Sequence, residues 1–472
     1  MPKRTKIVAT VGPACGERPM LRRMMEAGVD LFRINFSHGD PEQRADYLEK
    51  LRLAEQEVGR AVAICGDLCG PKIRVGMIVG GSTQLESGQE IVVSRQPVEG
   101  TNRRISTTLP ELVDVVHEGE NILLADGRLR LEVVRTSPPD AFTCKIVVGG
   151  SLGSGKGVNL PQTQLPVSTL TEKDRDDIEW IVRHDFDFVA QSFVQRADDV
   201  RQLRHLLERG GSTAQIIAKI EKPQALDHID AIIGEADAIM VARGDLGVEM
   251  DYPTVPIAQK SIAAKCQAAG KPCVIATEML ESMINSTRPT RAEVSDVANA
   301  VFDDADAVML SAESSIGRYP VEAVTAMRRT VEAAERSSDE LREPTRTSCS
   351  EPKTTAALAA SIRKIMEMES ITAIVLYTAS GTTARLIAKN RPTCPILALS
   401  AEVATVRRTC LYYGVIPFQT ELPRDTECLL KIAEQKVKSA GIAERGDRII
   451  VVGGHPMGQA GTTNFVVVQP VG

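Results

Sequence analysis

Two short stretches of the sequence end an apolar, β-prone run in charged residues. The first reads Ile-Ile-Ala-Lys-Ile-Glu and places Lys219 and Glu221 two residues apart, so a β-strand would carry both on one face. In the second, Asp245 follows Gly244, where the backbone can come close to a ligand. One carboxylate from each of two neighbouring strands suits Mg²⁺, which takes few protein ligands. Lys219 would then face the anion that the metal holds. The alternative is a buried lysine–glutamate ion pair inside a barrel.

Alternating strands and helices must position these side chains. Helices are expected at 17–27 and 41–58, and each is followed by a glycine. Eight strand–helix units along the chain predict a (β/α)₈ barrel, whose active site lies at the carboxyl ends of the strands. The charged residues named above fall at such ends. The expected strands are Lys6–Val11, a run leading into Arg33–Gly39, Ala61–Asp67, Phe188–Phe193, Ile216–Glu221, Ala238–Ala242, Cys273–Thr277 and Ala307–Ser311.

The strand–helix alternation breaks between 72 and 165, where Gly, Val, Thr and Ser are frequent and Leu129–Val134 alternates as a strand would. We expect an all-β domain inserted after the third strand, acting as a mobile lid. A capping box at Thr171 and Asp174 should start the helix that re-enters the barrel. A polar segment at 337–352 is expected to be a linker. The expected domains are the barrel at 1–70 and 167–340, a β-barrel lid at 71–166 and an α/β regulatory domain at 353–472.

The composition limits the partners of this chain. Its 472 residues carry a net charge of −6, with a pI near 5.7, so no global positive field would attract nucleic acid or an anionic membrane. The sequence shows neither a signal-peptide core nor a membrane-spanning run. Its ten cysteines lack metal-ligand spacing, which favours reduced thiols. We therefore expect a cytoplasmic protein that binds anionic ligands through local cations.

Two loops have the composition of phosphate-binding loops. Residues 150–157 nearly spell a P-loop, but Gly157 stands where a Ser or Thr is needed for Mg²⁺, and we reject that interpretation. Two interpretations of Lys156 remain open: it contacts a phosphate group, or it is a solvated surface lysine. The second loop, here called the hydroxyl loop, would place hydroxyl and N–H groups at a helix N-terminus; its alternative is an N-cap turn without a ligand. It contains Thr378, Ser380, Gly381, Thr382 and Thr383.

Six sequence blocks together resemble the pyruvate kinase family, in the family's order and over nearly the whole chain. They are Arg33–Gly39, Gly70–Arg74, Lys156–Pro161, Ala218–Glu221, Met240–Glu249 and Thr277–Met283. The resemblance implies a barrel, an inserted β lid and a C-terminal α/β domain. It also implies a glycolytic enzyme that transfers the phosphoryl group of phosphoenolpyruvate to ADP, giving pyruvate and ATP, and that assembles as a homotetramer.

The resemblance also assigns roles to individual residues. Glu221 and Asp245 would hold Mg²⁺ (or Mn²⁺) against the carboxylate and phosphate oxygens of phosphoenolpyruvate. Lys219 and Arg33 would neutralise the phosphoryl group as it moves, because such transfer is catalysed mostly by positioning and charge neutralisation. Thr277 would lie near the proton that is delivered to the enolate.

The remaining substrate contacts follow from the same resemblance. The carboxylate of phosphoenolpyruvate would be held by the hydroxyl of Thr277 and by the backbone N–H groups of Gly244 and Asp245. ADP would lie between the barrel and the lid, with a second divalent ion on its phosphates. The residues expected to contact ADP are Asn35, His38, Arg74 and Lys156.

The chain departs from the commonest family pattern at the third strand, where Leu68 replaces a threonine and Lys72 replaces a glutamate. This pattern resembles the K⁺-independent branch of the family. An ammonium at Lys72 could supply the charge that K⁺ brings, so K⁺ is expected to be dispensable; the alternative is that Lys72 points to solvent. A K⁺ site could persist on the remaining ligand positions, which are Asn35, Ser37, Asp67 and Leu68.

Two rival hypotheses are considered. A Mg²⁺-dependent aldolase or lyase barrel acting on a pyruvate enolate would share the carboxylate pair, but should lack the β insertion and the C-terminal domain. A degenerate kinase that only senses metabolites would need a broken catalytic set, and that set is intact here.

The hydroxyl loop resembles the family's allosteric sugar-phosphate site, although the sequence does not identify the effector or the preferred nucleoside diphosphate. The sequence also leaves open any redox role of Cys15, Cys65 and Cys69.

Overall fold

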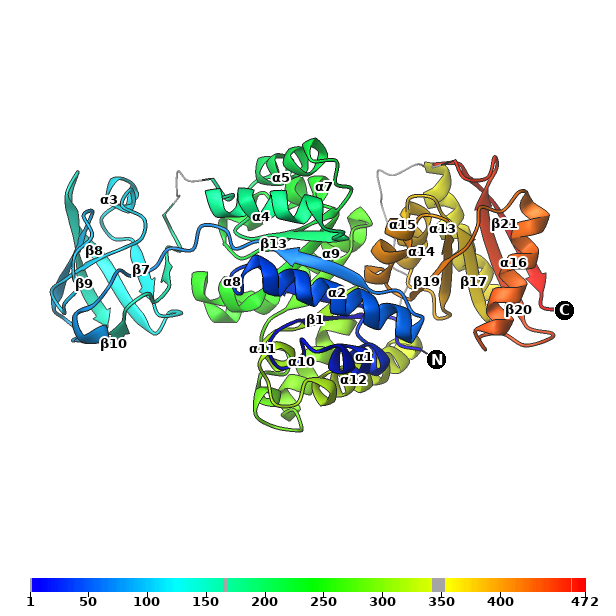
Figure 1. The fold of residues 1–472 in the computed structure, drawn as a ribbon, viewed down its shortest axis with the longest axis horizontal. Helices are drawn as coiled ribbons and strands as arrows, with labels where there is room; N and C mark the ends of the chain where they lie inside the picture. The colour runs from blue at the N-terminus through cyan, green and yellow to red at the C-terminus, as the bar shows by residue number, and fades with distance from the viewer. Residues whose placement is uncertain (1, 164–167, 342–352, 460) are drawn as a thin grey trace.

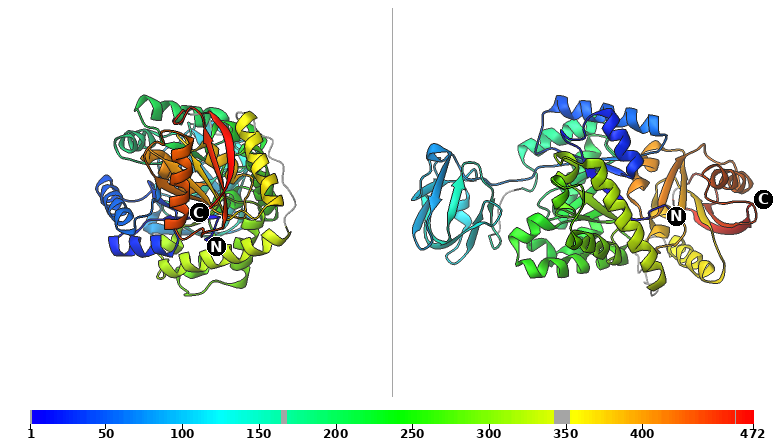
Figure 2. Two further views of the ribbon diagram at one scale, coloured as in Figure 1. Left: turned by 90° about the vertical axis from the view of Figure 1, so that its right-hand side faces the viewer. Right: turned by 90° about the horizontal axis from the view of Figure 1, so that it is seen from below.

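The computed structural model describes residues 2–163, 168–341, 353–459 and 461–472. The expected domain boundary at 166 and most of the linker expected at 337–352 therefore lie outside the described residues. Three bodies follow one another along the long axis of the molecule: an all-β body, a barrel and a C-terminal α/β body (Figure 1). A view from below shows the same order (Figure 2). No helix among the described residues is both long and apolar enough to cross a membrane.

The central body is a closed barrel of parallel strands in the order β1-β16-β15-β14-β13-β12-β3-β2. This confirms the predicted (β/α)₈ barrel. Several strands end slightly earlier than expected, so Glu221 and Thr277 lie just beyond β13 and β15 rather than within them. The strands are β1 (Lys6–Thr10), β2 (Leu31–Asn35), β3 (Ala63–Asp67), β12 (Phe188–Gln191), β13 (Gln215–Ile220), β14 (Ala238–Ala242), β15 (Cys273–Ala276) and β16 (Ala307–Leu310).

The barrel strands are buried on both faces because helices cover the outside while apolar side chains, small and large, fill the inside. Ala63, Ala190 and Ala238 belong to the inward-facing apolar cluster, which continues into the C-terminal domain. The outward faces pack with the helices in a second cluster. The predicted capping box at Thr171 and Asp174 is present at the start of α4. The principal covering helices are α1 (Arg18–Ala27), α2 (Pro41–Val58), α4 (Glu172–Arg183), α5 (Ala197–Arg209), α7 (Ile229–Glu235), α9 (Val255–Ala269), α10 (Arg291–Phe302) and α12 (Pro320–Leu341).

The inserted domain, here called the lid, is built almost entirely of strands, as predicted. They form a sheet in the order β11-β7-β8-β9-β5-β6 and a separate pair, β10-β4. One short helix, α3 (Leu112–Val115), interrupts them. The lid has its own apolar core. Its strands are β4 (Ser82–Leu85), β5 (Glu90–Ser94), β6 (Arg104–Ser106), β7 (Asn121–Leu124), β8 (Leu129–Ser137), β9 (Ala141–Val148), β10 (Gly150–Gly153) and β11 (Val158–Asn159).

The C-terminal domain is a single sheet in the order β19-β18-β17-β20-β21, in which only the edge strand β21 runs antiparallel. This confirms the predicted α/β domain. Its strands are β17 (Ala373–Tyr377), β18 (Ile396–Ser400), β19 (Val415–Gln419), β20 (Arg448–Gly454) and β21 (Thr463–Pro470). Its helices are α13 (Lys353–Met368), α14 (Thr382–Ala388), α15 (Val403–Arg408) and α16 (Thr426–Ser439).

A buried carboxylate joins this domain to the bottom of the barrel. Asp306, which precedes β16, accepts the N–H of Cys273 at 2.8 Å and pairs with Lys389 at 2.6 Å and with Arg391 at 3.3 Å. Burial lowers the pKa of Lys389, and the Asp306 carboxylate opposes that shift. The lysine and arginine belong to the C-terminal domain, so the barrel supplies the anion and its partner domain supplies the cations.

We predict that Asp306→Asn weakens the docking of the C-terminal domain, because it leaves the Lys389 ammonium buried without its carboxylate. Breaking a buried pair in this way typically costs about 3–5 kcal/mol, so the midpoint of urea unfolding should fall clearly. The matched control is Asp230→Asn, whose carboxylate is exposed and pairs with Lys265; such surface pairs contribute about 0–1 kcal/mol. Equal midpoints for the two variants would contradict this account.

Candidate active site

Lys219 lies at the carboxyl end of β13 inside a shell of oxygen atoms. Its Nζ is 2.7 Å from Glu221 Oε1 and 3.2 Å from Asp67 Oδ1, and it donates to Ser192 Oγ at 2.7 Å. Burial by itself lowers the pKa of Lys219, but the carboxylates of Asp67 and Glu221 more than reverse this, so the pKa lies above its usual value. The ion pair considered as an alternative is therefore present, and it fixes a charged ammonium at the catalytic end of the barrel.

Arg33 is held by the same carboxylate from the other side. It lies within β2, donates through Nε to Asp67 Oδ2 at 2.5 Å, and donates through Nη1 to Thr10 Oγ1 at 3.0 Å. Burial raises the pKa of Asp67, yet Arg33 and then Lys219 outweigh burial and lower it. The two cations predicted to face the phosphoryl group thus share one buried anion.

Glu221 and Asp245 lie close enough to repel each other. Glu221 is buried, and its Oε2 accepts the N–H of Phe193 at 2.9 Å. Its pKa is raised, first by burial and also by Asp245, while Lys219 opposes the shift. Asp245 is exposed in the first turn of α8 (Arg243–Glu249), which directly follows β14. The strands β13 and β14 are neighbours in the barrel, as the sequence predicted.

This pair fits an open divalent-metal site. Mg²⁺ binds through one or two carboxylates and completes its shell with water and substrate oxygens. The carboxylates of Asp67, Glu221 and Asp245 outnumber the cations Arg33 and Lys219, so an added divalent cation would relieve their mutual repulsion. Among the described residues, no group of three or more His, Cys, Asp or Glu side chains is arranged to hold a metal ion.

Thr277 and Gly244 meet beside this pair. Thr277 Oγ1 accepts the N–H of Gly244 at 2.7 Å and donates to the carbonyl of Ala276 at 2.6 Å. Thr277 has φ +68, a left-handed conformation that non-glycine residues seldom adopt outside functional sites. A Cβ on Gly244 would lie 3.4 Å from Thr277 Oγ1, so a larger residue would crowd this contact. The structure thus brings Gly244 and Thr277, both predicted to bind substrate, into direct contact, with the Gly244 N–H donated to the threonine.

Of the four residues predicted to contact ADP, Arg74 lines a cleft between barrel and lid. The cleft holds about 150 Å³, and the described residues that line it include Lys72, Arg74 and Asp245 but not Lys156, Asn35 or His38. Arg74 donates to the carbonyl of Gly155 at 2.9 Å, which places it beside Lys156 on the lid. Asn35 is the last residue of β2, and the exposed His38 follows that strand on the barrel.

Sequence comparisons identify the family. One family model, described as "Pyruvate kinase, barrel domain", matches residues 2–324, and another, "Pyruvate kinase, alpha/beta domain", matches residues 356–469. The chain belongs to the pyruvate kinase family. A pyruvate kinase of Methylorubrum extorquens is 44% identical over 98% of this chain and 96% of its own length. That of Geobacillus stearothermophilus is 42% identical over 100% of this chain and 81% of its own.

A solved structure agrees with this assignment. A crystal structure of a pyruvate kinase from Cryptosporidium parvum superposes with a TM-score of 0.93 at 34% identity, covering 100% of this chain and 96% of the other. Pyruvate kinase activity and a place in glycolysis follow from the family. The aldolase or lyase hypothesis is therefore set aside, because the chain carries both the lid and the C-terminal domain of a pyruvate kinase.

The positions expected to form a K⁺ site are largely engaged by protein groups. Asn35 Oδ1 accepts the N–H of Ser37 at 3.0 Å, and the carbonyl of Leu68 accepts the hydroxyl of Ser192 at 2.7 Å. Asp67 is shared by the two cations described above. Lys72 is exposed at the cleft.

Sequence reasoning missed Ser192, which bridges the Leu68 carbonyl and Lys219. Ser192 is nearly fully buried and directly follows β12. Its place at the carboxyl end of a predicted barrel strand was the one available signal, and a lone serine carries little chemistry on its own. Only the closure of the barrel, which sets β12 between β3 and β13, makes the contact visible.

The hydroxyl loop forms a cavity of its own in the C-terminal domain, with a volume of about 330 Å³. Gly381 donates its N–H to Thr378 Oγ1 at 2.9 Å, and Thr383 shares a hydrogen bond of 2.6 Å with Thr463. Gly381 has φ +86, where glycine is favoured. The described residues lining this cavity include hydroxyl and backbone groups but no lysine or arginine, so an anion there would be held by neutral donors.

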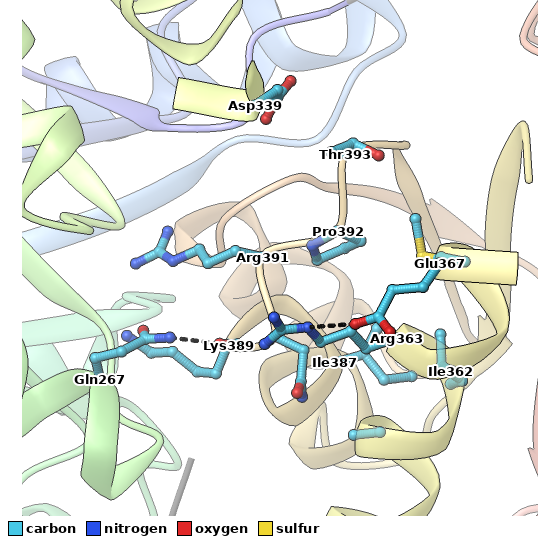
Figure 3. Close-up of a pocket in the computed structure, with 13 residues that line it drawn as sticks. Gln267, Asp339, Ile362, Arg363, Glu367, Ile387, Lys389, Arg391, Pro392 and Thr393 are labelled. Atoms are coloured by element: carbon cyan, nitrogen blue, oxygen red, sulfur yellow. Dashed lines mark hydrogen bonds and ion pairs between the residues drawn. The ribbon is translucent and has the colours of Figure 1, made fainter. Parts of the chain in front are cut away.

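A separate cavity of about 390 Å³ lies at the seam between the barrel and the C-terminal domain. It contains none of the residues predicted for catalysis. Figure 3 shows Gln267 of α9 donating to the carbonyl of Lys389, and Arg363 and Glu367 paired on α13. This cavity lies beside the Asp306 junction, at the end of the barrel opposite the active site.

Among the cysteines near the active site, the more deeply buried thiols should react more slowly. Burial raises the pKa of Cys15 to about 11 and also raises that of Cys65, so both stay protonated near neutral pH, whereas Cys69 is only half-buried. We predict that iodoacetamide at about pH 8 labels Cys69 before Cys15 and Cys65, because the thiolate is the reactive form. Peptide mass spectrometry over time measures this, and urea-unfolded chain should label all three alike. Equal labelling rates in the native chain would refute the prediction.

Proposed function

We propose that this chain performs its pyruvate kinase activity with Lys219 and Arg33 as the cations that meet the transferring phosphoryl group. One observation carries the proposal: the Lys219 ammonium is fixed by three oxygen atoms at the carboxyl end of the barrel, with Arg33 on the opposite side of their shared carboxylate. Phosphoryl transfer needs little covalent help from protein, and depends on positioning and charge neutralisation.

In the proposed reaction, a terminal phosphate oxygen of ADP attacks the phosphorus of phosphoenolpyruvate. The bond from phosphorus to the enol oxygen breaks, and its electron pair stays on that oxygen as the enolate. Lys219 and Arg33 stabilise the negative charge of the moving group. Because Asp67 and Glu221 already hold both cations in place, little reorganisation is needed at the moment of transfer.

Glu221 and Asp245 are proposed to hold Mg²⁺ or Mn²⁺. When bound, the ion supplies positive charge to the carboxylate and phosphate oxygens of phosphoenolpyruvate. The N–H of Phe193 orients the Glu221 carboxylate at 2.9 Å, and the first turn of α8 presents Asp245 to the cleft. A second ion on the ADP phosphates is implied by the family resemblance.

Thr277 is proposed to guide the proton that converts the enolate to pyruvate. Its hydroxyl currently donates to Ala276 and accepts from Gly244. A substrate carboxylate would take over the N–H groups of Gly244 and Asp245, and the Thr277 hydroxyl would turn from the Ala276 carbonyl toward the substrate. The proton is then added to the methylene carbon of the enolate.

The nucleotide and effector assignments extend the proposal. ADP is proposed to contact the barrel residues Asn35 and His38 and the lid residues Arg74 and Lys156. Arg74 lines the cleft that also contains Asp245, which supports the lid side of this assignment. A sugar phosphate is proposed for the hydroxyl loop, supported by its cavity and its hydroxyl donors. A homotetrameric assembly working in the cytoplasm is proposed from the family resemblance alone.

Lys219→Met should lower kcat far more than it raises the KM for phosphoenolpyruvate. Losing one preorganised charge donor typically costs about 3–4 kcal/mol, or roughly a hundred- to thousandfold in rate. A coupled assay for pyruvate formed with and without ADP measures this. Lys265→Met, on the barrel surface, is the control and should retain full turnover. Unchanged turnover in Lys219→Met would remove Lys219 from the mechanism.

K⁺ independence is proposed for this chain, because Lys72 places a positive charge at the cleft. Activity in tetramethylammonium salts should then stay within about twofold of that in potassium salts at equal ionic strength. Lys72→Glu should introduce a requirement for K⁺, since the substitution replaces a cation with an anion. A large loss of wild-type activity without K⁺ would overturn the proposal.

A further inference from the structure

Three barrel side chains hold the segment by which the chain leaves the lid. Glu249 Oε1, at the end of α8, accepts from Asn159 Nδ2 at 2.9 Å and lies 3.5 Å from Lys222 Nζ. Lys222 also donates to the carbonyl of Leu160 at 3.4 Å. Gln224 donates to the carbonyl of Pro161 at 2.9 Å. All three contacts fall within or just after β11, where the lid chain turns back to the barrel.

The charged members of this group are buried. Glu249 and Lys222 are each 4% exposed, and charges are rarely removed from water unless they are paired and hydrogen-bonded. Breaking such a pair leaves an uncompensated charge, so each partner depends on the other. A surface contact would not impose that constraint. Both charges belong to the barrel, and the lid exit meets them through the Asn159 amide and the Leu160 carbonyl. These hydrogen bonds favour one arrangement of the lid exit on the barrel.

The same short helix carries both the lid contact and the substrate groups. Gly244 and Asp245 lie in the first turn of α8, and Glu249 is its last residue. The lid approaches α8 at a second point, since a Cβ on Gly127 would lie 3.6 Å from Val248. This helix of seven residues therefore joins the lid exit to the barrel side of the cleft.

We propose that Glu249 is a positioning residue that, with Lys222 and Asn159, latches the lid to α8 and sets the lid's nucleotide contacts over the barrel. This inference rests on the proposed placement of ADP between barrel and lid. The latch aligns Arg74 and Lys156 with the barrel side of the cleft. Phosphoenolpyruvate is bound by barrel groups alone, so the latch acts mainly on the nucleotide.

The test uses a reciprocal exchange of donor and acceptor. Asn159→Asp sets two carboxylates against each other and should raise the KM for ADP by about tenfold or more, because one hydrogen bond to a charged group is worth at least that factor. The KM for phosphoenolpyruvate should stay within about twofold. Glu249→Gln alone should raise the KM for ADP more mildly, since it keeps an acceptor for Asn159 but loses the pairing with Lys222.

The double variant, Asn159→Asp with Glu249→Gln, restores a donor–acceptor pair in reverse. It should return the KM for ADP to within a fewfold of the wild-type value, a rescue that a general loss of folding would not give. Glu26→Gln, which removes an exposed carboxylate on α1, is the matched control and should leave both KM values unchanged. Thermal unfolding of each variant verifies that the chain is folded.

The outcomes separate the latch from the proposed function. If Asn159→Asp leaves the KM for ADP unchanged, or the double variant fails to rescue it, the latch is wrong. If the KM for phosphoenolpyruvate rises as much as that for ADP, Glu249 anchors α8 rather than the lid, which also overturns the proposal. Arg74→Met and Lys156→Met test the nucleotide site separately: no effect on the KM for ADP would refute that site instead.

Discussion

A single buried carboxylate, Asp67, determines the arrangement of the active site. It lies at the end of β3 and pairs with Arg33 from β2 and Lys219 from β13. An isolated charge at this depth would be expensive, so each of the three groups requires the others. The result is a pair of cations that are charged, shielded from bulk water and fixed in direction before any substrate arrives. That is the condition under which electrostatic stabilisation of a phosphoryl group is most effective.

The same physical device recurs at both domain junctions. Asp306 of the barrel pairs with Lys389 and Arg391 of the C-terminal domain. At the other end, the barrel pair of Glu249 and Lys222 forms hydrogen bonds with Asn159 and the Leu160 carbonyl of the lid exit. Buried ion pairs add little net stability compared with apolar packing, but they penalise misplaced partners strongly. The barrel is thereby joined to each neighbouring domain in a defined orientation. Catalysis across a cleft between two domains depends on that orientation more than on the stability of either domain.

Much of the fold was predictable because barrel strands have a strong local signature. Runs such as Cys273–Ala276 and Ala307–Leu310 are apolar throughout and alternate with helical segments, and both became buried parallel strands. The positions of Lys219 and Glu221 followed from strand periodicity. The exact strand ends did not, because Glu221 and Thr277 leave the strands where the backbone turns toward the site. Ser192 and Asn159 could not be recognised, since their roles depend on partners far away in the sequence.

The sequence by itself determined the identity of the chemistry: which side chains are available, at which strand ends they lie, and which family they resemble. Those properties depend on residues that are close together in the sequence, so motifs and hydrophobic periodicity reveal them. Only the tertiary structure decided how the charges are shared, with Asp67 between two cations, Ser192 bridging Leu68 and Lys219, and Glu249 reaching the lid. Such contacts join residues distant along the chain, and their strength depends on burial, which exists only once the barrel has closed around them.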